Sequence, residues 1–324
     1  MEKTLLEMST PTEVASYRAK RLKTTLAIDL CCGTGNDAIA LAKECKKVIG
    51  FDINPKAIEI AQKKAQEKKL KNISFYCQDC FSINLKELNP NIVFADPGRR
   101  KEGKRVKKLS ETEPSTIKLI EFIRKANIND FCIEASSNLP TKFFPKDCEK
   151  EFISINNKPN CVSLYFGNLK KSNYAVVVLP QQKTLRANEI KSLKDFVEKP
   201  LRYVFELDKG IIRAKMQGNL LQEIRKKFPK VFAFKENLFT SNNKAISPFF
   251  ANTFRLIGTT KKDQELYKLL EISKAGKVVI RGKFKDQAEQ LQLKQNLSKN
   301  LKGKRKIHVF YLEEETLVLR NVNL

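Results

Sequence analysis

The chain has 324 residues and a mass of 37.2 kDa, which is more than one domain of usual size, so two or three domains are expected. Hydrophobic residues make up 41% of the chain, enough to build real cores. No apolar stretch approaches the roughly 18 residues of a membrane helix. The first residues also lack the basic-then-apolar order of a secretory signal. These features exclude a membrane-spanning or secreted chain and predict a soluble, cytoplasmic protein.

The net charge of +26 is the strongest signal in the composition, because the chain has 62 Lys and Arg residues and only 36 Asp and Glu residues. A bias in the coding sequence would enrich lysine, but it would not by itself leave so few acidic residues. A basic surface binds polyanions through phosphate neutralisation and counterion release. The composition therefore favours a polyanionic partner, and a solvated lysine-rich surface is the alternative.

Eight cysteines lie in the first half of the chain, a usage that fits reduced thiols better than a disulfide framework. Cys77 and Cys80 have the spacing of metal ligands, but no second pair completes a tetrahedral site. Buried or loop thiols are therefore expected, and no metal is expected.

Strands and helices alternate over the first half of the chain, after a helical lead-in that begins with Thr10-Pro11. This alternation predicts βαβ units and a parallel sheet. The predicted strands are 26–30, 47–51, 73–77, 92–95 and 131–135, and the predicted helices are 37–44, 55–68 and 114–126. Three more strands, 151–155, 161–166 and 174–179, follow without a long helix between them and predict an antiparallel edge.

The pattern changes after Pro180, where residues 181–200 are expected to form a linker that enters a helix. Further strands are predicted at 203–207 and 231–234, and a helix at 220–228. From Thr253 a βαβαββ order predicts a compact α+β unit: strand 253–258, helix 263–273, strand 277–281, helix 285–298, and strands 306–312 and 316–321. The predicted domains are a lead-in at 1–24, an α/β domain at 25–180, a small ferredoxin-like α+β connector at 181–252 and an α+β domain at 253–324.

A glycine loop follows the first predicted strand and opens a helix, which is the usual setting for a nucleotide-like ligand. Gly33 and Gly35 lack a Cβ atom that would hold such a ligand away from the backbone. Asp29 lies inside the strand, four positions before Gly33, where dinucleotide-binding folds usually carry apolar residues. One GxG alone is weak evidence, and an acidic residue at this position makes it more specific.

Two more carboxylates lie at the ends of the next strands, Asp52 after the second and Asp79 after the third. Carboxyl ends of parallel strands share one edge, where ligands bind. Asp52 is positioned to accept bonds from two ribose hydroxyls, and Asp79 from an adenine amine. The structural alternatives are a loop tether for Asp29, a cap for the helix at Pro55 for Asp52, and a turn residue for Asp79. Their order and spacing together favour binding of S-adenosylmethionine (SAM).

These motifs resemble those of class I SAM-dependent methyltransferases with a Rossmann-like fold. More closely, the chain resembles a bacterial methyltransferase family that carries a C-terminal THUMP-like domain. The segments that carry this resemblance are Glu13-Val-Ala-Ser-Tyr-Arg18, Cys31-Cys-Gly-Thr-Gly35, Asp96-Pro-Gly-Arg-Arg100, Ser247-Pro-Phe-Phe250 and Val279-Ile-Arg-Gly282. The resemblance implies a cofactor site made of Asp29, Cys31, Gly33, Gly35, Asp52, Ile53, Asp79, Cys80 and Asp96. It also implies RNA as the substrate, by analogy with THUMP proteins.

The segment Asp96–Arg100 follows the fourth strand, where this kind of enzyme places its catalytic motif. Amino-methylating relatives carry Asp or Asn, two prolines and an aromatic residue that stacks on a flipped base. Asp96 and the Pro97 carbonyl fit the orientation of an acceptor, whereas Gly98 and Arg99 replace the second proline and the aromatic residue. Arg99 is expected to hold phosphate or base, and the departure puts methylation of a flipped base amine in doubt.

A run of basic residues after Asp96 is expected to contact RNA phosphates or bases, because arginine binds phosphate in a bidentate manner and stacks on bases. The Asp-Pro-x-Arg order also resembles uridine C5 methyltransferases. Those enzymes need a cysteine nucleophile after the fifth strand, where this chain has Glu134-Ala-Ser-Ser-Asn138, and Cys132 is expected in the core. Covalent catalysis is therefore not expected. The predicted RNA contacts are Arg99, Arg100, Lys104, Arg105, Arg281, Lys304 and Arg305, with a solvated basic surface as the alternative.

The predicted function is SAM-dependent methylation of a base in structured RNA, either tRNA or rRNA. Two alternatives stay open: a methyltransferase of protein or a small molecule, and a non-catalytic SAM-binding RNA module. The single histidine, His308, is expected to be structural or exposed, since no hydrolase triad can be assembled around it.

Overall fold

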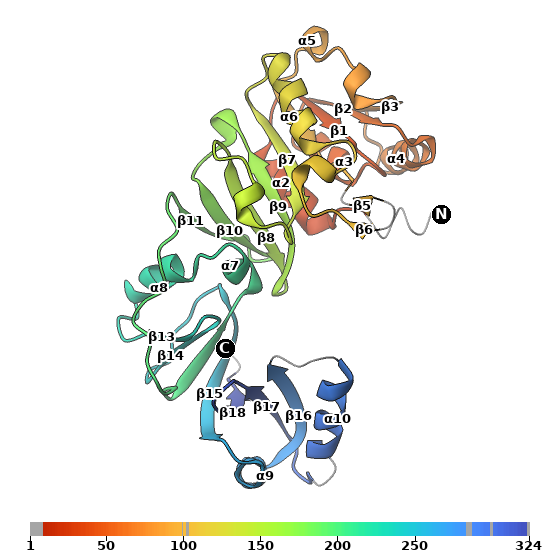
Figure 1. Cartoon of the computed structure of the whole chain (residues 1–324). Helices are drawn as coiled ribbons and strands as arrows, with labels where there is room; N and C mark the ends of the chain where they lie inside the picture. Colours follow the sequence, from red (N-terminus) through yellow and green to blue (C-terminus); the bar gives the residue numbers. More distant parts are fainter. Residues whose placement is uncertain (1–8, 99, 102–103, 283–286, 299–300, 323–324) are drawn as a thin grey trace. The chain divides into compact units, whose positions relative to one another are not determined.

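The computed structural model describes residues 9–98, 100–101, 104–282, 287–298 and 301–322 (Figure 1). The described chain forms two compact units. The first comprises the residues up to Ile190 together with Lys209–Lys215, and the second comprises Lys191–Asp208 and the residues from Met216 onward. The chain therefore returns to the first unit for seven residues before it completes the second.

A nine-stranded mixed sheet forms the centre of the first unit, in the order β11-β10-β8-β9-β7-β4-β1-β2-β3. Its strands are β1 Leu26–Leu30, β2 Lys47–Asp52, β3 Ile73–Cys77, β4 Ile92–Ala95, β7 Phe131–Ser136, β8 Glu149–Ile155, β9 Lys158–Tyr165, β10 Tyr174–Leu179 and β11 Lys183–Ala187. Its helices are α2 Thr12–Arg21, α3 Asn36–Ala42, α4 Pro55–Glu67, α5 Leu85–Leu88, α6 Thr116–Lys125 and α7 Lys209–Arg213. The five predicted parallel strands and the mixed α/β class are confirmed.

Strand direction changes beyond β7. β9 pairs antiparallel with both β7 and β8, and β10 pairs parallel with β8. β11 then pairs antiparallel with β10 and closes this edge of the sheet. The predicted linker at 181–200 is thus wrong at its start, because Lys183–Ala187 completes a hairpin instead of entering a helix.

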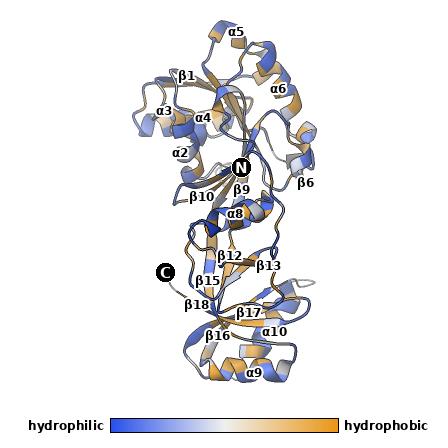
Figure 2. Cartoon of the chain, turned by 90° about the vertical axis from the view of Figure 1, so that its left-hand side faces the viewer, coloured by the Kyte–Doolittle hydropathy of each residue, from blue (hydrophilic) through white to orange (hydrophobic). Residues whose placement is uncertain are grey.

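Three helices of the first unit pack into one hydrophobic cluster against the sheet. The cluster takes Ala15, Ala19 and Leu22 from α2 and its end, and residues 38–42 from α3. From α4 come alanines and one isoleucine at helical spacing, a periodicity that makes one face of this helix apolar and leaves the other polar (Figure 2). The small alanine side chains let these helices approach the strands closely.

A seven-stranded sheet organises the second unit, in the order β13-β14-β12-β15-β18-β17-β16. Its elements are β12 Tyr203–Leu207, α8 Gln217–Arg225, β13 Phe232–Lys235, β14 Leu238–Ser241, β15 Phe250–Thr260, α9 Asp263–Ile272, β16 Ala275–Gly282, α10 Gln287–Ser298, β17 Arg305–Tyr311 and β18 Thr316–Asn321. β12 pairs with β15, so a single sheet extends across residue 252, where a domain boundary was expected. The first residues of predicted helix 285–298 lie outside the described residues. Among the helices in the described ranges, none has the length and apolar character needed to cross a membrane.

Candidate active site

A cavity of about 1120 Å³ lies at the carboxyl-terminal edge of the parallel strands in the first unit. Residues that follow β1, β2, β3, β4 and β7 line it, because each of these strands delivers its next loop to the same edge. Its lining includes Ser9, Thr10, Asp29, Cys31, Gly33, Thr34, Asn36, Asp37, Asp52, Ile53, Asp79, Cys80, Phe81, Phe94, Asp96, Pro97, Gly98, Glu113, Ser137 and Asn138. Eight of the nine predicted cofactor residues are among them, and Gly35 is the exception.

The two glycines of the loop serve different purposes. Gly33 has a φ of 52°, and a Cβ atom there would meet nothing within 4 Å, so this glycine borders open space. Gly35 has a φ of 80° and caps the start of α3. A Cβ atom at Gly35 would lie 2.8 Å from the Cβ of Ala61, so close packing against α4 requires glycine there.

Asp52 ends β2 and holds the glycine loop. Its Oδ2 accepts a hydrogen bond from the Gly33 N–H at 2.8 Å, and its Oδ1 accepts one from the Asn54 N–H at 2.9 Å. A carboxylate oxygen has more than one acceptor position, so Asp52 can hold the loop and still accept ribose hydroxyls. The alternative role as cap of α4 is wrong, because the side chain of Asn54 accepts from Lys56 N and Ala57 N instead.

Asp79 follows β3 and its Oδ1 accepts from the Phe81 N–H at 3.0 Å, which caps the short 3-10 helix Cys80–Ser82. This turn orients Cys80 toward the cavity, where it meets Cys31 from the glycine loop. The hydrogen bond between the two thiols and burial both raise the pKa of Cys31. Cys31 is therefore a neutral lining group.

Two apolar side chains lie beside these carboxylates. Ile53 is 73% exposed although it follows a buried strand, and Phe81 is also exposed. Both line the cavity. An exposed apolar pair next to Asp52 and Asp79 is suited to hold the flat faces of an aromatic ring such as adenine.

Asp29 is completely buried in β1 and lines the cavity. Among the described residues, neither of its carboxylate oxygens has a hydrogen-bond partner. Burial raises the pKa of Asp29 well above its usual range, and the charges of Asp37 and Asp96 raise it further. An unpartnered buried carboxyl group at a cavity wall fits a ligand that brings positive charge, and SAM carries both an ammonium and a sulfonium group.

Asp29→Asn is expected to stabilise the protein without ligand. The folded chain keeps the Asp29 proton at pH values where the unfolded chain, with a pKa of about 3.9, has lost it. Stability therefore falls as the pH rises through this window, and asparagine removes the penalty. We expect the Asp29→Asn variant to melt at a higher temperature than wild type. The difference should be about 2 to 4 °C for each kcal/mol by which the free energy of unfolding rises. Thermal melts should show a larger rise in melting temperature at pH 8 than at pH 5. An equal rise at both pH values, or no rise, would contradict a raised pKa of Asp29 in the folded protein.

The lead-in segment forms part of the cavity wall. Ser9 Oγ lies 2.7 Å from Thr34 Oγ1, and the Thr10 carbonyl accepts from Asn36 Nδ2 at 3.0 Å. Lys64 from α4 donates to Thr34 Oγ1 and Asn36 Oδ1 at 3.1 and 2.9 Å. The glycine loop is thus held from both sides by side chains distant in sequence.

A buried arginine behind the cavity was missed as a site residue. Arg18 of α2 forms an ion pair with Asp37 of α3 at 2.5 Å and a second ion pair with Glu134 of β7. Its guanidinium also lies 4.6 Å from the ring centroid of Phe94. Arg18 shares the apolar helix face of Val14, Ala15 and Ala19, and a charge on such a face was the available signal.

Asp96 and Pro97 follow β4 and line the cavity together with Gly98. Gly98 forms a backbone bridge in which its N–H donates to the Glu113 carbonyl at 2.8 Å and its carbonyl accepts from Glu113 N–H at 3.1 Å. Proline has no N–H to donate, and a Cβ atom at this position would already lie 3.0 Å from the Glu113 carbonyl oxygen. Glycine therefore replaces the second proline of related motifs for a local backbone reason.

The predicted basic residues fall into separate groups. Arg99 lies outside the described residues. β5 (Arg100–Lys101) and β6 (Lys104–Arg105) pair antiparallel, and β5 begins at the last residue of the segment Asp96–Arg100. In the second unit, Lys304 precedes β17 and Arg305 begins it, and both residues are exposed.

The side chain of Arg281 contacts other residues of the second unit, which argues against the predicted RNA contact at this position. Its guanidinium pairs with Glu206 at 2.6 Å, and its Nε donates to His308 Nδ1 at 3.4 Å. His308 is buried, and burial together with Arg281 and Lys306 lowers its pKa to about 4. His308 is therefore a neutral structural residue, as expected.

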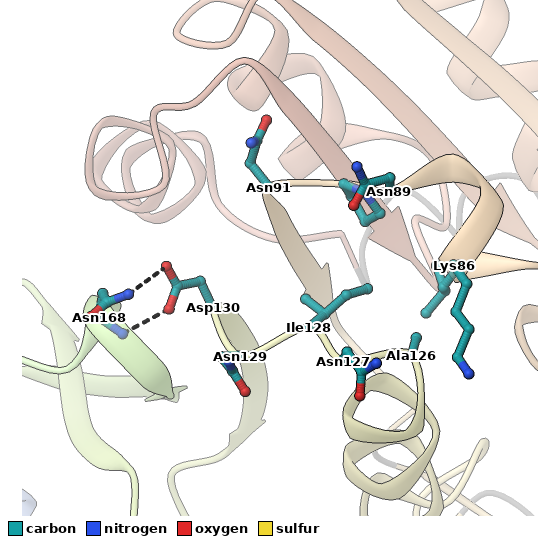
Figure 3. Close-up of a pocket in the computed structure, with 11 residues that line it drawn as sticks. Lys86, Asn89, Asn91, Ala126, Asn127, Ile128, Asn129, Asp130 and Asn168 are labelled. Carbon is teal, nitrogen blue, oxygen red and sulfur yellow. Dashed lines mark hydrogen bonds between the residues drawn. The ribbon is translucent and has the colours of Figure 1, made fainter.

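A second, smaller hollow of about 470 Å³ lies at the opposite edge of the sheet (Figure 3). Asn91 and Asp130, which precede β4 and β7, line it. Asp130 accepts from the backbone and side-chain nitrogens of Asn168 at 2.7 and 3.3 Å, as Figure 3 shows. Because it lies at the amino-terminal ends of the strands, this hollow is not part of the candidate active site.

The fold and the cavity define a methyltransferase domain, and the comparison with protein families agrees. A family model described as a methyltransferase domain matches residues 22–272. The chain belongs to this family, and SAM is the cofactor of its fold.

The chain is also similar to known RNA-modifying enzymes over short segments. It is 43% identical over 53 residues to the tRNA (uracil-5-)-methyltransferase homolog A of Homo sapiens, covering 16% of this chain and 8% of that protein. It is 30% identical over 96 residues to the 23S rRNA (uracil(1939)-C(5))-methyltransferase RlmD of Legionella pneumophila (strain Corby), covering 28% of this chain and 22% of that protein. The matches thus span less than a quarter of these relatives.

One solved structure is similar over almost the whole chain. The crystal structure of a candidate methyltransferase from Porphyromonas gingivalis W83 superposes with a TM-score of 0.78, covering 99% of this chain and 83% of that chain. The two sequences are 17% identical, so this similarity concerns the fold.

Proposed function

We propose that this protein transfers the methyl group of SAM to a base in structured RNA, either tRNA or rRNA. The observation that carries the proposal is the cavity at the strand ends, where Asp29, Asp52 and Asp79 lie beside Asp96 in a chain with a net charge of +26. The likeness to uracil methyltransferases of tRNA and rRNA supports an RNA substrate.

The residues of the chain divide between cofactor and acceptor. Asp52 takes the ribose hydroxyls, Asp79 the adenine amine, and Asp29 the positive charge of the methionine part. When bound, SAM would supply an electrophilic methyl group: the acceptor atom bonds to the methyl carbon and releases its proton to water, and the sulfur leaves with the electron pair of the C–S bond. Asp96 and the Pro97 carbonyl hold the acceptor in line with that bond, so the main contribution of the protein is orientation and electrostatic complementarity.

A cysteine nucleophile is not part of the proposed reaction. Uridine C5 methyltransferases resemble this chain in the Asp-Pro-x-Arg order, but Ser137 and Asn138 stand after β7 where a cysteine would be needed. Cys132 is completely buried within β7 and is absent from the cavity wall. We therefore propose direct transfer to the acceptor, without a covalent bond between enzyme and RNA.

Residues 253–324 of the second unit are proposed to dock the RNA as a THUMP-like domain. The α+β order from β15 to β18 supports this proposal, and so do the exposed basic residues before and in β17: Lys302, Lys304, Arg305 and Lys306. Strands β5 and β6 of the first unit support the same substrate. They hold four basic residues of the sequence, Arg100, Lys101, Lys104 and Arg105, and a basic segment favours a polyanionic partner.

Transfer of tritiated methyl from SAM to total RNA tests the proposal directly. We expect label in RNA, whereas label only in protein or metabolites would favour the other substrate classes. Binding of SAM and RNA without any transfer would favour a non-catalytic module.

RNA affinity is expected to depend steeply on salt. If about six phosphates are contacted, the logarithm of the association constant should fall by roughly 4 to 5 for each tenfold rise in salt concentration. Filter binding between low and physiological salt measures this slope. A flat response would count against RNA as the substrate.

A further inference from the structure

Helix α7 belongs to the first unit, although the chain before and after it belongs to the second. Gly210, Ile211 and Ala214 are buried there, and the Lys209 N–H donates to Asn157 Oδ1 at 2.9 Å, which fixes the start of the helix. The segment is therefore held on the first unit by contacts that do not involve the side chain of Arg213.

Arg213 ends this helix and contacts the loop after β7. Its Nε donates to the Ser137 carbonyl at 2.7 Å, and its Nη2 donates to Asn138 Oδ1 at 2.6 Å. Ser137 and Asn138 both line the active-site cavity. A residue 75 positions further along the chain thus holds the loop that follows β7.

The contact determines the orientation of the Asn138 amide. Arginine carries only donors, so the amide atom that faces Arg213 must be the oxygen. The NH₂ group of Asn138 consequently points away from Arg213. Within the part of the chain that the structure describes, this group donates to no protein atom, and Asn138 is exposed at the cavity.

We propose that Arg213 is a positioning residue that sets the Asn138 amide to donate a hydrogen bond to an oxygen of the target nucleotide. This inference rests on the proposed methylation of RNA. The donor NH₂ group requires an acceptor, which in RNA is a base carbonyl or a phosphate oxygen. Asn138 and Asp96 together then offer the nucleotide one donor and one acceptor in the same cavity.

Asn138→Asp separates this role from a purely structural one. An aspartate at 138 still accepts from Arg213, so the loop keeps its support, but it has lost the donor. We expect kcat/KM for total RNA to fall at least about tenfold, which corresponds to the loss of one hydrogen bond of about 1.4 kcal/mol. The dissociation constant of SAM, measured by calorimetry, should change less than about twofold and shows that the protein is folded.

Variants at Arg213 complete the test. Arg213→Ala releases the loop and should also lower kcat/KM for RNA, and Arg213→Lys should restore part of the loss because it keeps a donor. Lys209→Ala removes the same charge from the same helix, and its activity should match wild type. Methyl transfer by Asn138→Asp within about twofold of wild type would overturn the inference while the proposed function stands. A wild-type protein that methylates no RNA would overturn both.

The two oxygen types can be told apart once the target nucleotide is mapped. A synthetic RNA with an uncharged methylphosphonate at that nucleotide restores transfer by Asn138→Asp if the partner is the phosphate. Transfer stays low with this RNA if the partner is a base carbonyl.

Discussion

Asp96→Ala is expected to lower the rate of methyl transfer to RNA by about 10² to 10³-fold, the usual cost of removing one preorganised polar group at the reacting centre. Asp96 follows β4 and lines the cavity between the cofactor carboxylates and the loop after β7. In the proposed reaction it is the carboxylate that orients the acceptor. Single-turnover assays with tritiated SAM measure the loss.

Two variants control this prediction. Asp96→Asn keeps an acceptor oxygen and should retain more activity than alanine, since related motifs use either residue. Asp147→Ala removes an exposed carboxylate that pairs with Arg124 at the surface, and its rate should equal that of wild type. An Asp96→Ala protein that methylates RNA at near wild-type rate would exclude Asp96 from the reaction.

Arg18→Leu is expected to lower the free energy of unfolding by about 3 to 5 kcal/mol, because it leaves two buried carboxylates without their cation. Arg18 is 1% exposed, as is its partner Glu134, and Asp37 is 8% exposed. Burial alone already raises the pKa of Asp37, so the loss of the guanidinium leaves an unfavourable pair of acids. Urea unfolding followed by circular dichroism measures the change.

The surface pair of Arg124 and Asp147 provides the matched control. Their side chains are 46% and 61% exposed, and Arg124→Ala should cost no more than about 1 kcal/mol. Neutralising both acids in the Arg18→Leu background, with Asp37→Asn and Glu134→Gln, should recover part of the stability. If Arg18→Leu and Arg124→Ala lower the free energy of unfolding equally, the buried ion pairs of Arg18 stabilise the fold no more than the exposed pair of Arg124 does.

The parts of the site that follow local sequence rules were predictable. The parallel strands and the carboxylates Asp29, Asp52 and Asp79 could be located, because strand periodicity and a glycine loop are local patterns. The strand ends then meet at one edge by topology alone. The eight predicted cofactor residues that line one cavity follow from this geometry.

Contacts between distant segments could not be predicted from one sequence. Arg18 meets Glu134 across 116 positions, and Arg213 meets Asn138 across 75. Neither spacing leaves a periodic signal. The strands β11 and β14 were missed for a related reason, since Lys183–Ala187 and Leu238–Ser241 are short and gain their stability from pairing with neighbouring strands.

Gly98 illustrates how structure changes the interpretation of a motif. In the sequence it is a departure from the expected second proline. In the fold its N–H bridges to the Glu113 carbonyl at 2.8 Å, a bond that proline cannot make. The departure thus has a backbone cause that is independent of the acceptor.

Calorimetric titration of the purified protein with SAM tests most directly whether the acidic strand ends hold this cofactor. We predict uptake of one SAM per chain, with affinity lost in Asp52→Ala, since this carboxylate holds the glycine loop and is proposed to accept the ribose hydroxyls. Absence of any binding heat from SAM and from S-adenosylhomocysteine, in a protein shown to be folded, would contradict the assignment of the cavity.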